Sequence, residues 1–361
     1  MAFQNSSGSS PVDVNPALCV KPSNSSPDML KVLAVIYMVS SFLSIIGALS
    51  IIIFACKKRI VCNYEIHPLF HLSVADFFLA CGWFITTLLW WVKRNDSVEA
   101  ANGCFYLEIV TEIFHVASFF LTVNYATHVF VRIKQRTRDT GSHGFFYRKL
   151  FFGLYILSWV GPVLLMLPMV IYYSHHDFLD CSRCLLLFDR PKARMYEEGV
   201  EVTNTNNYAW RNYGSLVLVI TLGISIVLLL VLYFLAMKTF TSVIKRSGLL
   251  SIQQRELIES NKKRVMLYIV VFFICWFPAF VVAFIDLATE DQNYNFKKWF
   301  FVFLLEGIFT PMQGFFNSLV YGWTRNSFRR LSQNGGSYRR PLVSPDGFTA
   351  SFYGAIAERD E

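Results

Sequence analysis

The sequence predicts an all-α membrane protein, a bundle of seven transmembrane helices with its N-terminus outside and its C-terminus in the cytoplasm. Composition is the first observation, since 54% of the 361 residues are hydrophobic, 16% are charged and the mean hydropathy is +0.41. Such values are typical of a chain solvated mostly by lipid. The second observation is a set of seven long apolar segments, and the third is the one-sided placement of the basic residues between them.

Each apolar segment meets the length that a transmembrane helix needs, about 20 residues for about 30 Å of hydrocarbon. The segments are expected to be helical, because strands with open edges cannot satisfy their backbone groups in lipid. The expected spans are residues 30–56, 68–92, 104–131, 149–172, 213–237, 265–288 and 298–322. Residues 1–29 are expected to form an extracellular tail and 30–322 the transmembrane domain. Residues 323–331 are expected to form an amphipathic helix on the inner membrane surface, and 332–361 a disordered cytoplasmic tail.

Lys and Arg gather in the loops of one side, which the positive-inside rule places in the cytoplasm. The clusters are Lys57, Lys58 and Arg59; Arg132, Lys134, Arg136 and Arg138; Lys245, Arg246, Lys262, Lys263 and Arg264; and Arg325, Arg329 and Arg330. The net charge of +8 forms no continuous basic face, so membrane lipids and no nucleic acid are the expected partners.

Glycosylation triplets agree with this orientation. Asn5, Asn24 and Asn95 each head an Asn-X-Ser/Thr triplet on the predicted outer side, where such sites are modified. Chance occurrence of triplets in a Ser-rich tail is the alternative.

Four cysteines also lie on the predicted outer side, where disulfides persist: Cys19, Cys104, Cys181 and Cys184. They permit three complete pairings, and the sequence does not choose among them. A bond from Cys104 to Cys181 or Cys184 is favoured, because it would tie the long second outer loop to the third helix. Free thiols are the alternative.

The chain is not expected to be an enzyme. His67 and His71 are four residues apart, as zinc ligands on a helix often are. Pro68 places His67 at the helix start, however, and the seventh span offers no histidine to complete a hydrolase site. No catalytic residue, metal site, nucleotide loop or redox cofactor motif is expected.

Three motifs indicate which class of seven-helix protein the sequence resembles: Leu72-Ser73-Val74-Ala75-Asp76, Cys275-Trp276-Phe277-Pro278 and Asn317-Ser318-Leu319-Val320-Tyr321. Together they resemble the rhodopsin-like receptors of the G-protein-coupled superfamily. The acidic-Arg-aromatic triplet of that family is missing from the third helix, which reads His128-Val129-Phe130-Val131-Arg132. Trp159, Pro162 and residues 311–317 resemble the cyclic-AMP-receptor-like branch, and within it the orphan receptors of the transmembrane protein 116 family.

The resemblance implies that Asp76 faces Ser118 and Asn317 in a polar cluster that can hold a sodium ion. A water-filled plug without an ion is the alternative. It also implies a switch built from Trp276, the Pro278 kink and Tyr321.

A second group of polar residues follows from helical spacing. Glu108, Glu112 and His115 share one face of the third helix, at the depth of an outer ligand cavity. We expect them to bind an extracellular ligand that is cationic or forms hydrogen bonds, with Trp276 and Glu306 as further contacts. An internal network between helices is the alternative.

These expectations describe an orphan receptor that passes an extracellular signal to heterotrimeric G proteins by helix rearrangement. The residues expected to face the G protein are Arg132, Lys245, Arg246, Lys262, Lys263 and Arg264, unless they contact only lipid headgroups. Arrestin is a further expected partner, and the plasma membrane the expected location, with a cilium or an internal membrane as alternatives. The rival function is a seven-helix scaffold or trafficking protein that does not activate G proteins.

Overall fold

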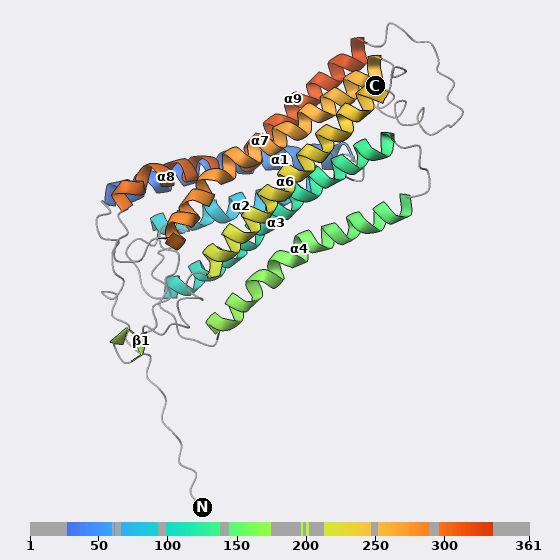
Figure 1. The fold of residues 1–361 in the computed structure, drawn as a ribbon. Coiled ribbons are helices and arrows are strands. Elements are labelled where there is room, and N and C mark those ends of the chain that lie inside the picture. Colours follow the sequence, from blue (N-terminus) through green and yellow to red (C-terminus); the bar gives the residue numbers. More distant parts are fainter. Residues whose placement is uncertain are drawn as a thin grey trace, which may run out of the picture.

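The computed structural model describes residues 27–59, 61, 66–92, 99–137, 144–174, 196–197, 200–201, 213–246, 252–288 and 296–334. Its helices are α1 (Pro27–Lys57), α2 (His67–Val92), α3 (Glu99–Thr137), α4 (Gly144–Ser174), α6 (Tyr213–Arg246), α7 (Ile252–Ala288), α8 (Phe296–Phe309) and α9 (Gln313–Asn334). Two short strands, β1 (Tyr196–Glu197) and β2 (Val200–Glu201), pair antiparallel. The helices lie alongside one another as a bundle (Figure 1).

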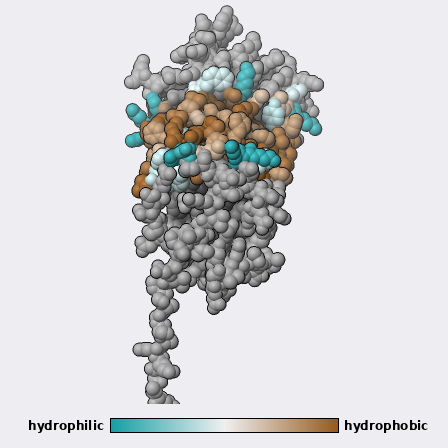
Figure 2. Space-filling model, turned by 90° about the vertical axis from the view of Figure 1, so that its left-hand side faces the viewer, coloured by the Kyte–Doolittle hydropathy of each residue, from teal (hydrophilic) through white to brown (hydrophobic). Residues whose placement is uncertain are grey.

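The bundle carries its apolar side chains on the outside as well as in the core. Six of the described helices are each long and apolar enough to cross a membrane, and α8 with α9 makes a seventh crossing if the bent pair is one span. Brown, apolar side chains form a band across the face of the molecule that Figure 2 shows. The predicted class, an all-helical membrane protein, is therefore confirmed.

The seventh expected span is broken into two helices. Residues 298–322 were expected to form one helix, but α8 ends at Phe309 and α9 begins at Gln313, with a bend of 48° between them. The break contains Pro311, which has no N–H to donate and disfavours a helical conformation at the residue before it. The turn is closed instead by the N–H of Met312, which donates to the carbonyl of Phe309 at 3.2 Å.

Helix α1 packs along this bent pair through small side chains, which let the backbones approach closely. The Ser40 hydroxyl donates to the Gly307 carbonyl at 2.8 Å, and the Gly314 N–H donates to the Ser44 hydroxyl at 3.1 Å. Nearer the predicted inner end, the rings of Phe54 and Tyr321 lie 6.0 Å apart. Along these three contacts the residue numbers rise both in α1 and in the α8–α9 pair, so α8 and α9 run parallel to α1.

Helix α3 is the centre of the bundle and packs against α2, α4 and α6. Its buried side chains include Phe119, which lies in the main apolar cluster with Leu222 of α6 and Phe272 of α7. Helix α4 is the least buried span and lies at the edge of the bundle, against α3 (Figure 1).

The helices at the predicted cytoplasmic end are longer than the expected spans. Helix α6 continues to Arg246 and α7 begins at Ile252, whereas residues 213–237 and 265–288 were expected to span the membrane. Helix α9 likewise runs without a break to Asn334, so residues 323–331, expected as a separate surface helix, belong to α9. The helical ends of α3, α6 and α9 and the start of α7 gather at the same end of the bundle in Figure 1.

Candidate functional site

The centre of the candidate site is the carboxylate of Asp76 on α2, which is 2% exposed. The hydroxyl of Ser118 on α3 donates to Asp76 Oδ1 at 2.8 Å, and the side-chain amide of Asn317 on α9 donates to Oδ2 at 2.8 Å. The structure thus brings together the three side chains that the sequence analysis grouped. Two hydrogen bonds reduce the cost of burying this polar group among apolar helices.

Two further residues extend these contacts into a chain of hydrogen bonds. Gln313 of α9 donates from Nε2 to the Ser118 hydroxyl at 3.0 Å, and its Oε1 accepts a short hydrogen bond from the indole N–H of Trp276 on α7. All of these side chains are buried. The chain, which we call the polar relay, runs from Trp276 through Gln313, Ser118 and Asp76 to Asn317.

Gln313 was not among the residues singled out from the sequence. A signal was present, because Gln313 lies four residues before Asn317 and therefore on the same helical face.

The expected sodium ion can be tested against this geometry. A carboxylate, a hydroxyl and an amide suit a small hard cation. Each oxygen of Asp76, however, already accepts a hydrogen bond at 2.8 Å, and the Ser118 hydroxyl accepts a third from Gln313. These direct contacts satisfy the polar groups without an ion, and sodium binding stays a prediction.

Trp276 is fully buried at the outer end of the relay. The His115 ring lies 4.3 Å from it, and the Phe119 ring meets it edge-on at 4.6 Å. Two residues later Pro278 lies inside α7, where it removes a backbone hydrogen bond. The Thr310 hydroxyl, at the break between α8 and α9, donates to the Cys275 carbonyl at 3.0 Å. The irregular points of α7 and of the bent pair are therefore in direct contact.

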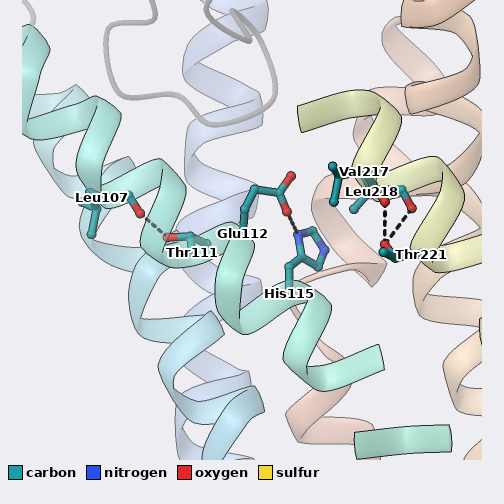
Figure 3. A network of polar contacts seen from close by, with 7 residues as sticks. All are labelled: Leu107, Thr111, Glu112, His115, Val217, Leu218 and Thr221. Atoms are coloured by element: carbon teal, nitrogen blue, oxygen red, sulfur yellow. Dashed lines mark hydrogen bonds and ion pairs between the residues drawn. The ribbon is translucent and has the colours of Figure 1, made fainter. Parts of the chain in front are cut away.

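Glu112 and His115 form a pair on α3, one turn apart. His115 Nδ1 lies 2.9 Å from Glu112 Oε2, and Figure 3 shows the carboxylate meeting the imidazole on one face of the helix. The carboxylate fixes the ring so that Nε2 points away from it. His115 Nε2 is buried without a hydrogen-bond partner among the described residues.

The remaining predicted ligand contacts lie on two helices. Glu108 is half-buried one turn before Glu112 on α3, and Glu306 on α8 is 1% exposed. The buried Trp83 ring of α2 lies 6.2 Å from His115 and stacks on Tyr37 of α1 at 5.1 Å.

At the predicted inner end of the bundle, Tyr321 is buried in a cluster with Tyr268 of α7 and Ile51 of α1. Lys263 of α7 is exposed. Arg132 lies in α3, Lys245 and Arg246 in α6, and Lys262 and Arg264 in α7, but their side chains lie outside the described part.

Several predicted residues lie outside the described residues altogether: Asn5, Asn24, Asn95, Cys181 and Cys184. Cys104 falls in α3, but its side chain is not described. The predicted disulfide and glycosylation sites are therefore untested.

The chain matches a known protein family and is similar to, among others, one distant relative whose name is informative. Residues 30–339 match the family Transmembrane protein 116. Cyclic AMP receptor-like protein C of Dictyostelium discoideum is 30% identical over 110 residues, which make up 30% of this chain and 28% of that relative. The match thus covers under a third of either protein.

Proposed function

This chain belongs to the transmembrane protein 116 family, and we propose that it works as a G-protein-coupled-type receptor for an extracellular ligand. The distant similarity to a protein named as cyclic AMP receptor-like supports this proposal. No enzymatic family is indicated.

The observation that carries the proposal is the polar relay. It joins α2, α3, α7 and α9 through buried hydrogen bonds, and its outer end, Trp276, contacts His115. A ligand that displaces His115 or Trp276 would change the hydrogen bond to Gln313. A buried network has few arrangements in which every polar group has a hydrogen-bond partner. Such a change therefore favours a second, distinct packing of the helices over a gradual distortion.

The residues predicted to contact the ligand indicate its class. Glu108, Glu112 and Glu306 are acidic, so an anionic ligand such as a nucleotide phosphate would meet like charges there. A cation, or a neutral ligand that donates hydrogen bonds, fits better, and the rings of Trp83 and Trp276 suit a cationic group.

A G-protein dissociation assay tests this function in cells. The full-length chain would be expressed with each α-subunit family in turn, and basal dissociation compared with that of cells expressing an unrelated membrane protein. We expect a basal signal with at least one family, altered in Gln313→Leu, which removes two bonds of the relay. Ser158→Ala, a buried change in α4 outside the relay, is the matched control and should leave the signal unchanged.

The second candidate function is a seven-helix scaffold or trafficking protein that does not activate G proteins. It is favoured by the inner end of α3, where His128 is buried against the Phe151 ring of α4 at 4.6 Å. This stretch lacks the charged triplet of rhodopsin-like receptors. Absence of a signal with every α-subunit family would support the scaffold and reject the receptor.

A further inference from the structure

The inner halves of α2, α3 and α4 hold a polar cluster that the polar relay does not use. His67 and His71 lie one turn apart at the start of α2, with ring centroids 4.6 Å apart. The ring of Tyr155, from α4, lies 4.9 Å from each of them. The three rings form a triangle, and each carries an atom able to bind a metal ion.

The two histidines have ring nitrogens available. Both are half-buried, and in the described part of the chain neither imidazole takes part in a hydrogen bond. Two histidines at positions i and i+4 can present their nitrogens to one ion. Their place at the first turns of α2 is on the predicted cytoplasmic side, within reach of water.

A second observation comes from Asn124 on α3. It is 2% exposed, and neither atom of its amide has a hydrogen-bond partner among the described residues. Leu121, one turn before it, packs with Tyr155, and His128, one turn after it, packs on Phe151 of α4. Asn124 therefore faces α4 at the level of Tyr155. A buried amide without a partner costs about 1–3 kcal/mol, so a bound water or ion is expected there.

We propose that His67, His71 and the phenol oxygen of Tyr155 bind a divalent transition-metal ion of the zinc type, with Asn124 holding a water molecule bound to it. Imidazole nitrogen is a good ligand for zinc, copper and nickel, and zinc commonly takes four ligands. No three His, Cys, Asp or Glu side chains converge as a metal site in the described residues, so the third protein ligand is a tyrosine. The ion would tie α2 to α4, the least buried span.

This site differs from a hydrolase centre. Among the described residues no carboxylate contacts these rings to act as a base, and the role of the site is to hold two helices together. A reversible ion at this place would make the packing of α4 depend on metal concentration, whether or not the chain activates G proteins.

The test uses the full-length protein in lipid nanodiscs, purified without a polyhistidine tag. His175 and His176 are replaced by alanine in every sample, because this adjacent pair would bind metal by itself. Zinc affinity is measured by competition with a chromophoric chelator, and copper is bound for electron paramagnetic resonance. We expect the copper signal to be split by two imidazole nitrogens when both histidines are present. In His71→Phe, which keeps a ring in the cluster, one nitrogen should remain.

Loss of a residue that only hydrogen-bonds to a metal ligand usually weakens metal binding on the order of 10–100-fold. Removal of a ligand itself should weaken zinc binding at least as much. His67→Phe and His71→Phe should each do so, and Tyr155→Phe should weaken it about tenfold. His128→Phe, which changes a histidine of α3 packed on Phe151, should leave the affinity unchanged. Thermal melting without metal verifies that each variant is folded. The site would be overturned if the protein with His67 and His71 intact bound zinc no more tightly than the His67→Phe/His71→Phe double variant.

Discussion

Ser118 is the residue on which the polar relay depends. Its hydroxyl uses both of its roles, donating to Asp76 at 2.8 Å and accepting from Gln313 at 3.0 Å. No apolar side chain of similar size can do this. Loss of the hydroxyl would leave a buried carboxylate oxygen and a buried amide N–H each short of a partner.

Ser118→Ala should therefore lower the free energy of unfolding by about 1–3 kcal/mol. Thermal unfolding of the purified protein in nanodiscs measures the loss. Ser158→Ala on α4 is the control, because Ser158 is also buried but its hydroxyl donates to the Leu154 carbonyl of its own helix at 2.8 Å. That loss should stay within about 1 kcal/mol. Equal losses in the two variants would contradict the relay.

Glu112 allows a test of the ligand site that keeps its shape. Glu112→Gln retains a polar group beside His115 but removes the charge, and charged hydrogen bonds contribute about 1 kcal/mol more than neutral ones. Once an agonist is found, its potency should fall about fivefold to tenfold, with surface expression intact. Asp28→Asn, at the exposed start of α1, is the control for lost charge and should not change potency. Unchanged potency in Glu112→Gln would remove Glu112 from the ligand site.

The residues that meet at Asp76 were predictable. Of the rest of the relay, helical spacing could have placed Gln313 on the face of Asn317, but its contact with Trp276 depends on how α7 and α9 pack. Asp76 and Asn317 belong to motifs of the family that the sequence resembles, and that resemblance implies that Ser118 on the third helix faces them. The place of Gln313 relative to α8 depends on the break at 310–312, which changes the direction of the chain by 48°. Hydropathy counts apolar residues and carries no information on direction, so the continuous span 298–322 hid the bend.

Helices α1 and α9 approach each other closely at two glycines. A Cβ atom built on Gly47 would lie 2.5 Å from the Cα of Phe315, and one on Gly314 would lie 2.8 Å from the hydroxyl oxygen of Ser44. The first contact is with backbone, which cannot turn aside as a side chain can. The close approach also permits the hydrogen bond from Gly314 N–H to Ser44.

Gly47→Ala should accordingly destabilise the bundle by about 1–3 kcal/mol, the usual cost of inserting a methyl group into a packed contact. Gly223→Ala on α6 is the matched control, because a Cβ there meets nothing within 4 Å. Since alanine favours helix over glycine by about 1 kcal/mol in water, the control should be neutral or slightly stabilised. Melting temperatures in nanodiscs compare the two. A neutral Gly47→Ala would mean that α1 and α9 lie further apart than described.

For the whole molecule, the gathering of long helices at one end agrees with the predicted direction of signalling. Helices α3, α6 and α7 all extend past the residues expected in lipid (Figure 1). Lys263 in the extension of α7 is exposed. Basic residues of these extensions would contact either a G protein or anionic headgroups, and both require this end to be cytoplasmic. Every functional interpretation of these basic residues therefore depends on the orientation of the chain in the membrane.

The number of crossings is the property on which orientation depends. Six of the described helices are each long and apolar enough to cross the membrane, and the total becomes odd only if α8 and α9 cross as one. A re-entrant pair would run back toward its starting side. Successive contacts argue against this, because Ser40 meets Gly307, Ser44 meets Gly314 and Phe54 meets Tyr321. At 1.5 Å per residue, the stretch of α1 from Ser40 to Phe54 covers about 21 Å of depth, and the bent pair descends with it.

We therefore expect the two ends of the chain on opposite sides of the membrane. With an epitope tag at each end, antibody applied to intact cells should reach the N-terminal tag alone, and the C-terminal tag only after permeabilisation. A tag inserted after Gln292, between α7 and α8, should be reached like the N-terminal one, because α8 and α9 then carry the chain inward. If antibody reached both terminal tags in intact cells, the chain would cross the membrane an even number of times. The α8–α9 pair would then be re-entrant, and the receptor would be ruled out.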